Sequence, residues 1–326
     1  MSYSSLGLSS EMRALSSRQV TQLFLQRYGL LISYGLVVLG LSVMSNRFLS
    51  TTNQVNVLRQ ASINAIVSVG MTLVILTGGI DLSVGSTLAL SAVISATLMK
   101  NGLGVPWAVI AALGIGIGLG LVNGLMITRG KIPPFIATLG MLTVARGLAL
   151  MYTQGQPVTG LPAGFRLIGA GTIGPVPMPI VVAGIMVGFG LVLLRQTRVG
   201  EYIYAIGDNV QAARMAGVPT DRIINLVYVI SGFCAALAGL VLIARLDSAQ
   251  PVIGQGYEFN AIAAVVVGGT SFSGGEGGLP STLLGALLIE TLDNGLNLLN
   301  VSALWEQVVK GAVIAMALLL YKKLGR

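Results

Sequence analysis

The chain has no histidine and a single cysteine among its 326 residues, and only 9% of its residues are charged. Without histidine there is no Ser-His-Asp triad, no His-ligated zinc and no histidine proton relay. Cys234 cannot form an intrachain disulfide, and its place in an apolar run indicates a packing residue rather than a reactive thiol. Because soluble chains carry about a quarter charged residues, so little charge predicts a protein that lies in a membrane.

Hydrophobic residues, in contrast, make up 54% of the chain, and 44 residues are glycine. Gly116, Gly120 and Gly124 recur every four residues, which predicts one helix face that packs tightly against a neighbour. The net charge of +8 does not predict a nucleic-acid partner, because the basic residues gather between the apolar segments. We therefore predict an all-α, polytopic membrane protein surrounded by lipid.

About ten apolar segments reach, or nearly reach, the roughly 20 residues that a helix needs to cross the hydrocarbon core. They are residues 28–45, 57–77, 84–100, 106–128, 133–153, 178–195, 222–244, 258–270, 280–300 and 304–321, of which the eighth is the shortest. No small-residue cleavage site follows the first, so we expect an uncleaved span. The expected organisation is a polar N-terminal segment, residues 1–27, followed by a transmembrane domain, residues 28–326.

The distribution of Lys and Arg predicts the orientation, because positive residues accumulate in cytoplasmic loops. An even number of spans places both termini on one side, and cytoplasmic termini put most basic residues inside. The inside group is Arg13, Arg18, Arg27, Arg129, Lys131, Arg195, Arg198, Arg214, Arg222, Lys322, Lys323 and Arg326. The outside group is only Arg47, Lys100, Arg166 and Arg245. We therefore expect both termini to be cytoplasmic.

Two connecting loops are long. Residues 154–177, rich in glycine and proline, are expected outside, and residues 196–221 inside. The inside loop holds a run that favours a short helix ended by glycine. Its residues are Gln211, Ala212, Ala213, Arg214, Met215, Ala216 and Gly217. Such a polar helix between two spans is suited to docking a soluble partner, although a solvated connector is the alternative.

No motif for bond chemistry is present. A P-loop has four residues between its first glycine and the Gly-Lys pair, and a serine or threonine after the lysine. Here five residues separate Gly124 from Gly130 and Lys131, and Ile132 follows, so this run is not a P-loop. The Gly-x-Gly-x-x-Gly run at residues 169–174 precedes three prolines within five residues, where no helix can start cleanly to cradle a phosphate. We predict a chain with no catalytic residues, no metal and no cofactor of its own.

A glycine-rich turn with a carboxylate joins the second and third apolar segments, and a turn of similar form recurs downstream. The first turn contains Gly78, Gly79, Asp81, Ser83 and Gly85, and the second contains Gly268, Gly269, Ser273 and Gly275. Corresponding glycine-interrupted segments in two halves of a transporter point to its pathway, although similarity by chance is an alternative in a glycine-rich chain. We interpret the turns as hinges or helix breakpoints. Capping of the next helix by Asp81 or Ser83 is favoured over substrate contact for Asp81.

Polar residues also form one face on each of two predicted spans. The faces are Gln60, Asn64, Ser68 and Thr72, and Glu290, Asp293, Asn294 and Asn297. They could line a path for a polyhydroxyl substrate, or they could join neighbouring helices by hydrogen bonds. Arg146 has no partner nearby in the sequence, and Asp81 or Glu290 are the candidates.

Together these runs resemble the permease subunits of bacterial sugar ABC importers, in the carbohydrate branch of the ribose/branched-chain amino acid permease family. The resemblance covers nearly the whole chain. It depends on residues 64–66 (NAI), 69–86 (VGMTLVILTGGIDLSVGS), 135–139 (FIATL), 202–207 (YIYAIG), 244–251 (ARLDSAQP) and 261–271 (AIAAVVVGGTS).

The resemblance implies a bacterial inner-membrane permease that moves a monosaccharide inward by alternating access, with ribose expected first and another pentose, a hexose or a furanose as alternatives. It implies a permease homodimer or a close paralogue, an extracytoplasmic sugar-binding protein, and a separate cytoplasmic ATPase that binds ATP and Mg. The family's coupling loop commonly reads Glu-Ala-Ala-x-x-x-Gly, and Gln211 replaces the glutamate here. An ion-coupled secondary sugar transporter, with Asp81, Glu290 and Asp293 as coupling carboxylates, is the other functional hypothesis, and a membrane scaffold without transport is a third.

Overall fold

A computed structural model describes residues 17–302 together with residues 305, 308, 311 and 312. The long helices are α2 (Ser17–Met44), α3 (Thr51–Leu76), α4 (Val84–Lys100), α5 (Val105–Thr128), α6 (Pro134–Thr153), α8 (Met178–Gln196), α11 (Thr220–Leu246) and α13 (Leu279–Leu298). The short helices are α7 (Ala163–Ala170), α9 (Arg198–Asp208), α10 (Val210–Met215) and α12 (Tyr257–Val267). Four two-residue strands are β1 (Val158–Thr159), β2 (Thr172–Ile173), β3 (Val176–Pro177) and β4 (Ser248–Ala249).

The helical membrane-protein class is confirmed. Five of the described helices, α3, α5, α6, α8 and α11, are long and apolar enough to cross a membrane. Each predicted span up to residue 300 overlaps one of the helices, and the span at residues 304–321 lies outside the continuously described part of the chain. The first helix begins at Ser17, before the predicted boundary at residues 27 and 28.

Helices α3 and α11 form the core. Within their apolar windows 83% and 78% of the residues are buried, against 22% in α5 and 28% in both α6 and α8. The three outer helices expose large apolar side chains such as Trp107, Phe135 and Ile185, which a hydrocarbon solvent accommodates. We infer that α5, α6 and α8 face lipid while α3 and α11 are enclosed by protein.

The glycine face of α5 packs on α11, as its spacing predicts. A Cβ added at Gly116 or Gly120 would overlap the carbonyl oxygen of Gly232 or Tyr228. A Cβ at Gly124 would lie 2.9 Å from the Cα of Asn225. Only glycine allows the two backbones to approach this closely.

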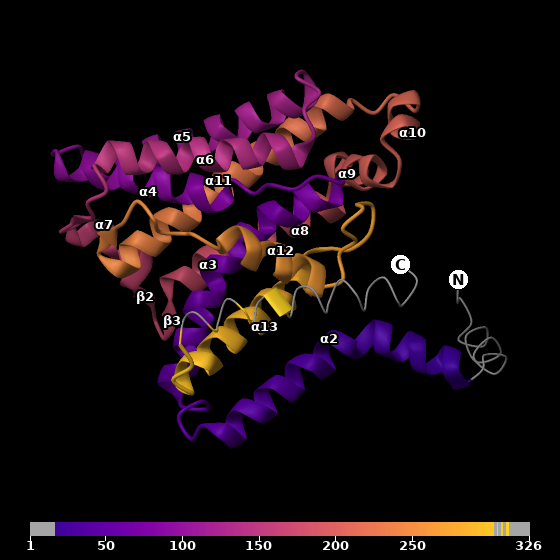
Figure 1. The fold of residues 1–326 in the computed structure, drawn as a ribbon, viewed down its shortest axis with the longest axis horizontal. Helices are drawn as coiled ribbons and strands as arrows, with labels where there is room; N and C mark the ends of the chain where they lie inside the picture. The colour runs from indigo at the N-terminus through magenta and orange to yellow at the C-terminus, as the bar shows by residue number, and fades with distance from the viewer. Residues whose placement is uncertain (1–16, 303–304, 306–307, 309–310, 313–326) are drawn as a thin grey trace.

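The loops gather at opposite ends of the helices (Figure 1), with α7, β2 and β3 at one end and α9 and α10 at the other. At the first end, β1 pairs antiparallel with β4, Val158 opposite Ala249. The Arg166 guanidinium lies 3.3 Å from the Asp247 carboxylate, which also accepts a hydrogen bond from Leu161 N. Residues 154–177 and 245–258 therefore form one surface.

Candidate functional site

The first glycine-rich turn lies between α3 and α4, and its carboxylate is buried. One oxygen of Asp81 accepts hydrogen bonds from Ser83 N at 3.0 Å and from Ser83 Oγ at 2.6 Å. The other accepts from Ser231 Oγ of α11 at 2.8 Å, and Asn123 Nδ2 of α5 donates to Ser83 Oγ at 2.9 Å. Ser83 occupies the N-cap position of α4 without making a side-chain cap bond, so the predicted capping by Ser83 is wrong. Asp81 instead holds the turn to α11.

The glycines of this turn are needed at specific contacts. Gly78 has a φ of +76°, a conformation that favours glycine. A Cβ at Gly79 would lie 2.6 Å from the hydroxyl of Tyr228, which donates to Ile80 O at 3.1 Å. Gly85 lies against Glu258 and Gly254 so closely that a Cβ would overlap both. The turn is thus packed against α11 and the start of α12.

The second turn lies between α12 and α13 and also depends on glycine. Gly269, Gly274 and Gly275 have φ values of +85°, +90° and +76°, and a Cβ at Gly268 would lie 2.7 Å from Ser281 O. Ser273 is exposed, whereas Ser83, its counterpart in the sequence pattern, is buried. The two turns share a glycine pattern but have different surroundings.

The two turns touch each other and the end of α9, and we call this contact the glycine junction (Leu76, Gly78, Gly207, Gly274 and Gly275). Gly275 N donates to Leu76 O at 3.0 Å. A Cβ at Gly207 would overlap Leu76 O and Gly275 N, and one at Gly274 would lie 2.8 Å from Gly78 N and 2.9 Å from Gly207 Cα. At Gly207, helix α9 therefore contacts both helix breaks through backbone atoms. Gly207 belongs to the run 202–207 that carries the family resemblance, but no local pattern predicts that it contacts two distant segments of the chain.

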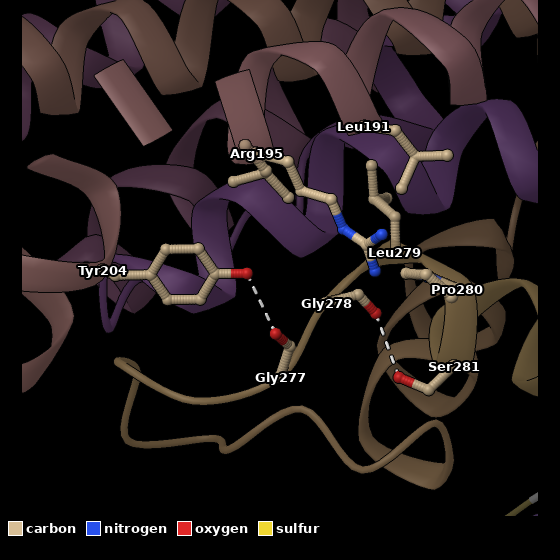
Figure 2. Close-up of a pocket in the computed structure, with 9 residues that line it drawn as sticks. Leu191, Arg195, Tyr204, Gly277, Gly278, Leu279, Pro280 and Ser281 are labelled. Carbon is tan, nitrogen blue, oxygen red and sulfur yellow. Dashed lines mark hydrogen bonds between the residues drawn. The ribbon is translucent and has the colours of Figure 1, made fainter. Parts of the chain in front are cut away.

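A pocket of about 280 Å³ lies between the end of α8, α9 and the start of α13 (Figure 2). Across it the Tyr204 hydroxyl donates to Gly277 O at 2.9 Å, and Arg195 extends toward the first residues of α13. Burial raises the pKa of Tyr204 above its usual value, and Arg195 acts in the opposite direction. The phenol stays protonated at neutral pH, so it can donate this hydrogen bond.

The short helix predicted within residues 196–221 is α10. Asn209 caps it by accepting from the backbone N–H groups of Gln211 and Ala212, both at 3.0 Å. Gly217, two residues past its end, has a φ of +85°. Ala213 is buried, whereas Gln211, Ala212 and Arg214 are exposed. The Arg214 guanidinium donates hydrogen bonds to Thr220 and Asp221 at the start of α11. Helix α10 thus stands out at one end of the molecule, directly after α9.

The two polar faces meet between α3 and α13. The Thr72 hydroxyl bonds Thr282 at 3.2 Å, and the Asn53 and Asn294 amides exchange two hydrogen bonds of 2.9 Å each. Ser68 donates to Asn64 Oδ1 at 3.4 Å. Of the remaining members, Gln60 is half-buried, and Glu290 and Asp293 are buried. Asn297 is exposed and donates to Asp293 O. Hydrogen bonding between helices therefore accounts for Thr72 and Asn294, and a role in a substrate path stays a prediction for the set.

Replacing Asn294 by alanine is expected to weaken the contact of α3 with α13, because it removes both bonds to Asn53. The buried Asn53 Oδ1 then loses its donor, although Nδ2 keeps its bond to Phe48 O. The two single substitutions, Asn294→Ala and Asn53→Ala, and the double substitution form a cycle. We expect a coupling free energy of about 0.5–2 kcal/mol from thermal unfolding of the detergent-solubilised protein. Additive single effects would show that the pair does not join the helices.

Arg146 is bound by backbone. Its Nη1 donates to Pro251 O at 2.7 Å and to Ile253 O at 2.9 Å. The candidates proposed from the sequence, Asp81 and Glu290, were wrong because the loop after α11 folds back to α6, which no local pattern indicates.

Comparison with known proteins identifies the family of the chain. Residues 53–318 match the family described as branched-chain amino acid transport system / permease component. The chain belongs to this permease family. It is 47% identical over 301 residues to the ribose import permease protein RbsC of Bacillus subtilis (strain 168), covering 92% of this chain and 94% of the relative. It is 44% identical over 310 residues to RbsC of Escherichia coli (strain K12), covering 94% and 97%. It is 36% identical over 307 residues to the D-allose transport system permease protein AlsC of Escherichia coli (strain K12), covering 93% and 94%. No solved structure matches the chain.

The family sets aside two hypotheses. The chain is neither an ion-coupled secondary transporter nor a scaffold without transport. It is a permease, the transport component of an importer, and a multi-pass protein of the bacterial inner membrane. The permease subunit of an ABC importer implies an ATPase and a binding protein as partners. The predicted resemblance is confirmed.

Proposed function

We propose that this permease carries ribose inward as the membrane subunit of an ATP-driven importer. Identities of 44–47% to ribose import permeases over more than nine tenths of the chain support ribose. Another pentose, a hexose such as the allose named for one relative, or a furanose is the alternative, because much of the selectivity of such importers lies in the binding protein.

The permease works as a homodimer or with a close paralogue, with about ten spans and cytoplasmic termini. ATP and Mg are held by a separate cytoplasmic ATPase. The absence of a P-loop from the sequence supports this division of labour. The surface formed by residues 154–177 and 245–258 meets the sugar-binding protein, and α10 docks on the ATPase at the opposite end.

The glycine junction carries the mechanism. Helix α10 follows α9 after a single residue, and α9 contacts both helix breaks at Gly207. Packed interfaces of this kind move between discrete arrangements rather than deforming continuously. Closure of the ATPase pushes α10, α9 shifts at the junction, and the segments on either side of the two breaks tilt to open the path alternately to each side.

Uptake of labelled ribose by vesicles tests this function. The complete complex, with the binding protein and the ATPase, is expected to accumulate ribose only when ATP reaches the cytoplasmic side. Matched vesicles without the ATPase serve as the control, and unlabelled allose and xylose as competitors. Uptake by the permease alone, driven by a proton or sodium gradient and insensitive to ATP, would contradict the proposal. ATP-driven uptake of a competitor but not of ribose would replace the substrate.

A further inference from the structure

Helix α4 is at the lower limit of the length of a membrane span and α12 is below that limit, and their N-terminal ends meet. They have 17 and 11 residues, against the roughly 17–25 of a span. Asp81, just before α4, bonds Ser231, which lies about 17 Å along α11 at a rise of 1.5 Å per residue. Because α11 is roughly 40 Å long, the start of α4 is near the middle of the bilayer. Gly85 touches Glu258, which brings the start of α12 to the same depth.

The two helices lead away from this point in opposite directions. Helix α4 leads to β1 and β4, and α12 leads to the second glycine-rich turn and the start of α13. Each N-terminus carries a partial positive charge of about +0.5 from unpaired N–H groups. Two carboxylates, Asp81 and Glu258, lie at these ends, where the positive ends favour negative charge.

The two carboxylates differ in how they are satisfied. Asp81 accepts three hydrogen bonds, one from the backbone and two from serine hydroxyls. Glu258 is 5% exposed and accepts at Oε1 from Gly256 N at 3.2 Å, whereas its Oε2 has no hydrogen-bond partner among the described residues. That oxygen is aimed at Gly85 in the first turn of α4, where only the absence of a side chain leaves room. A buried carboxylate oxygen left without a donor at membrane depth marks a functional site.

A second acceptor at the same end of α4 is also unpaired. Asn123 donates to Ser83 Oγ, and its Oδ1 has no partner in the described part of the chain. A ligand for this place must therefore donate hydrogen bonds. The guanidinium of Arg146 already acts electrostatically on Glu258, and the two helix N-termini present further positive charge, so a second cation is disfavoured. A neutral polyol, with several hydroxyl donors, meets both conditions.

We propose that Glu258 accepts a hydroxyl of the transported sugar at the midpoint of its path, where the N-termini of α4 and α12 meet. The inference rests on the proposed function and names a contact of the same path. Gly85 and the break before α4 make the carboxylate reachable when the two helices separate during the transport cycle. No local pattern predicts this role for Glu258, an acid at the start of the shortest apolar segment.

Transport of ribose and of its 2-deoxy, 3-deoxy and 5-deoxy analogues tests the contact in the complete complex. Each sugar is supplied at saturating concentration, and both the rate of transport and the amount of sugar moved per ATP hydrolysed are measured. In the wild type, at least one analogue is expected to move about tenfold more slowly than ribose, because it leaves the carboxylate unpaired. In Glu258→Ala the rate for ribose falls to that of this analogue, so the preference disappears. Glu258→Asp restores part of it.

Glu201→Gln, an exposed acid on α9, is the matched control and should keep the preference. If Glu258→Ala slows all four sugars equally, Glu258 has only a structural role and the proposal is wrong. Unchanged transport in Glu258→Ala would also contradict it. So would a wild-type requirement for sodium or protons that the substitution removes. Failure of the proposed function has a different signature, the absence of ATP-driven uptake in the wild type itself.

Discussion

Replacing Gly207 by alanine should uncouple the importer, so that ATP hydrolysis continues while little sugar is moved. The added Cβ would overlap Leu76 O and Gly275 N, and both are backbone atoms that cannot rotate away. Overpacking of this kind costs roughly 1–3 kcal/mol. At about 1.4 kcal/mol per factor of ten, we expect a fall of about tenfold in ribose moved per ATP. The measurement is uptake and phosphate release on the same vesicles.

Two further variants make this result specific. Gly184→Ala, on the neighbouring α8, is the matched control because a Cβ there would have no atom of the described residues within 4 Å, so transport should be unchanged. Tyr204→Phe removes only the hydroxyl that bonds Gly277 O and is expected to lower the coupling ratio less than Gly207→Ala without affecting folding. A normal ratio of sugar to ATP in Gly207→Ala vesicles would show that the junction does not transmit the motion of α10.

Replacing Asp81 by alanine should strongly destabilise the permease. The substitution leaves Ser83 N and the hydroxyls of Ser83 and Ser231 without their acceptor in a buried region. Each buried polar group left unpaired costs about 1–3 kcal/mol, so we expect a loss of roughly 3 kcal/mol or more in the free energy of unfolding. Thermal unfolding of the detergent-solubilised protein measures this, and Asp81→Asn, which can still accept at one oxygen, should be milder.

The same experiment separates two roles for Asp81. Asp221→Asn provides a matched control, because its side chain is half exposed and its ion pair with Arg214 lies on the surface, where such pairs contribute about 0–1 kcal/mol. If Asp81→Ala unfolds at the wild-type temperature yet loses uptake, Asp81 contacts the sugar and does not merely hold the backbone.

Local patterns predicted the parts of this permease that depend on local physics. Apolar segments long enough to cross the membrane, the glycines where α3 and α12 end, the glycine face of α5 and the short helix α10 are each encoded by neighbouring residues. Hydrophobic length, backbone freedom and helix termination act within a few residues of the chain, so they can be read without the fold.

Long-range contacts decided the rest. The pattern could not tell that Asp81 is satisfied by Ser231, 150 positions later, or that Asn294 pairs with Asn53, 241 positions earlier. Nor did it indicate Gly207, whose importance comes from the backbones of Leu76 and Gly275, or Glu258, whose second oxygen has no donor among the described residues. The sequence by itself determined a helical membrane permease and where its helices break. Only the tertiary structure decided which carboxylate holds the fold and which is left open, because hydrogen-bond satisfaction depends on what packing brings within 3 Å.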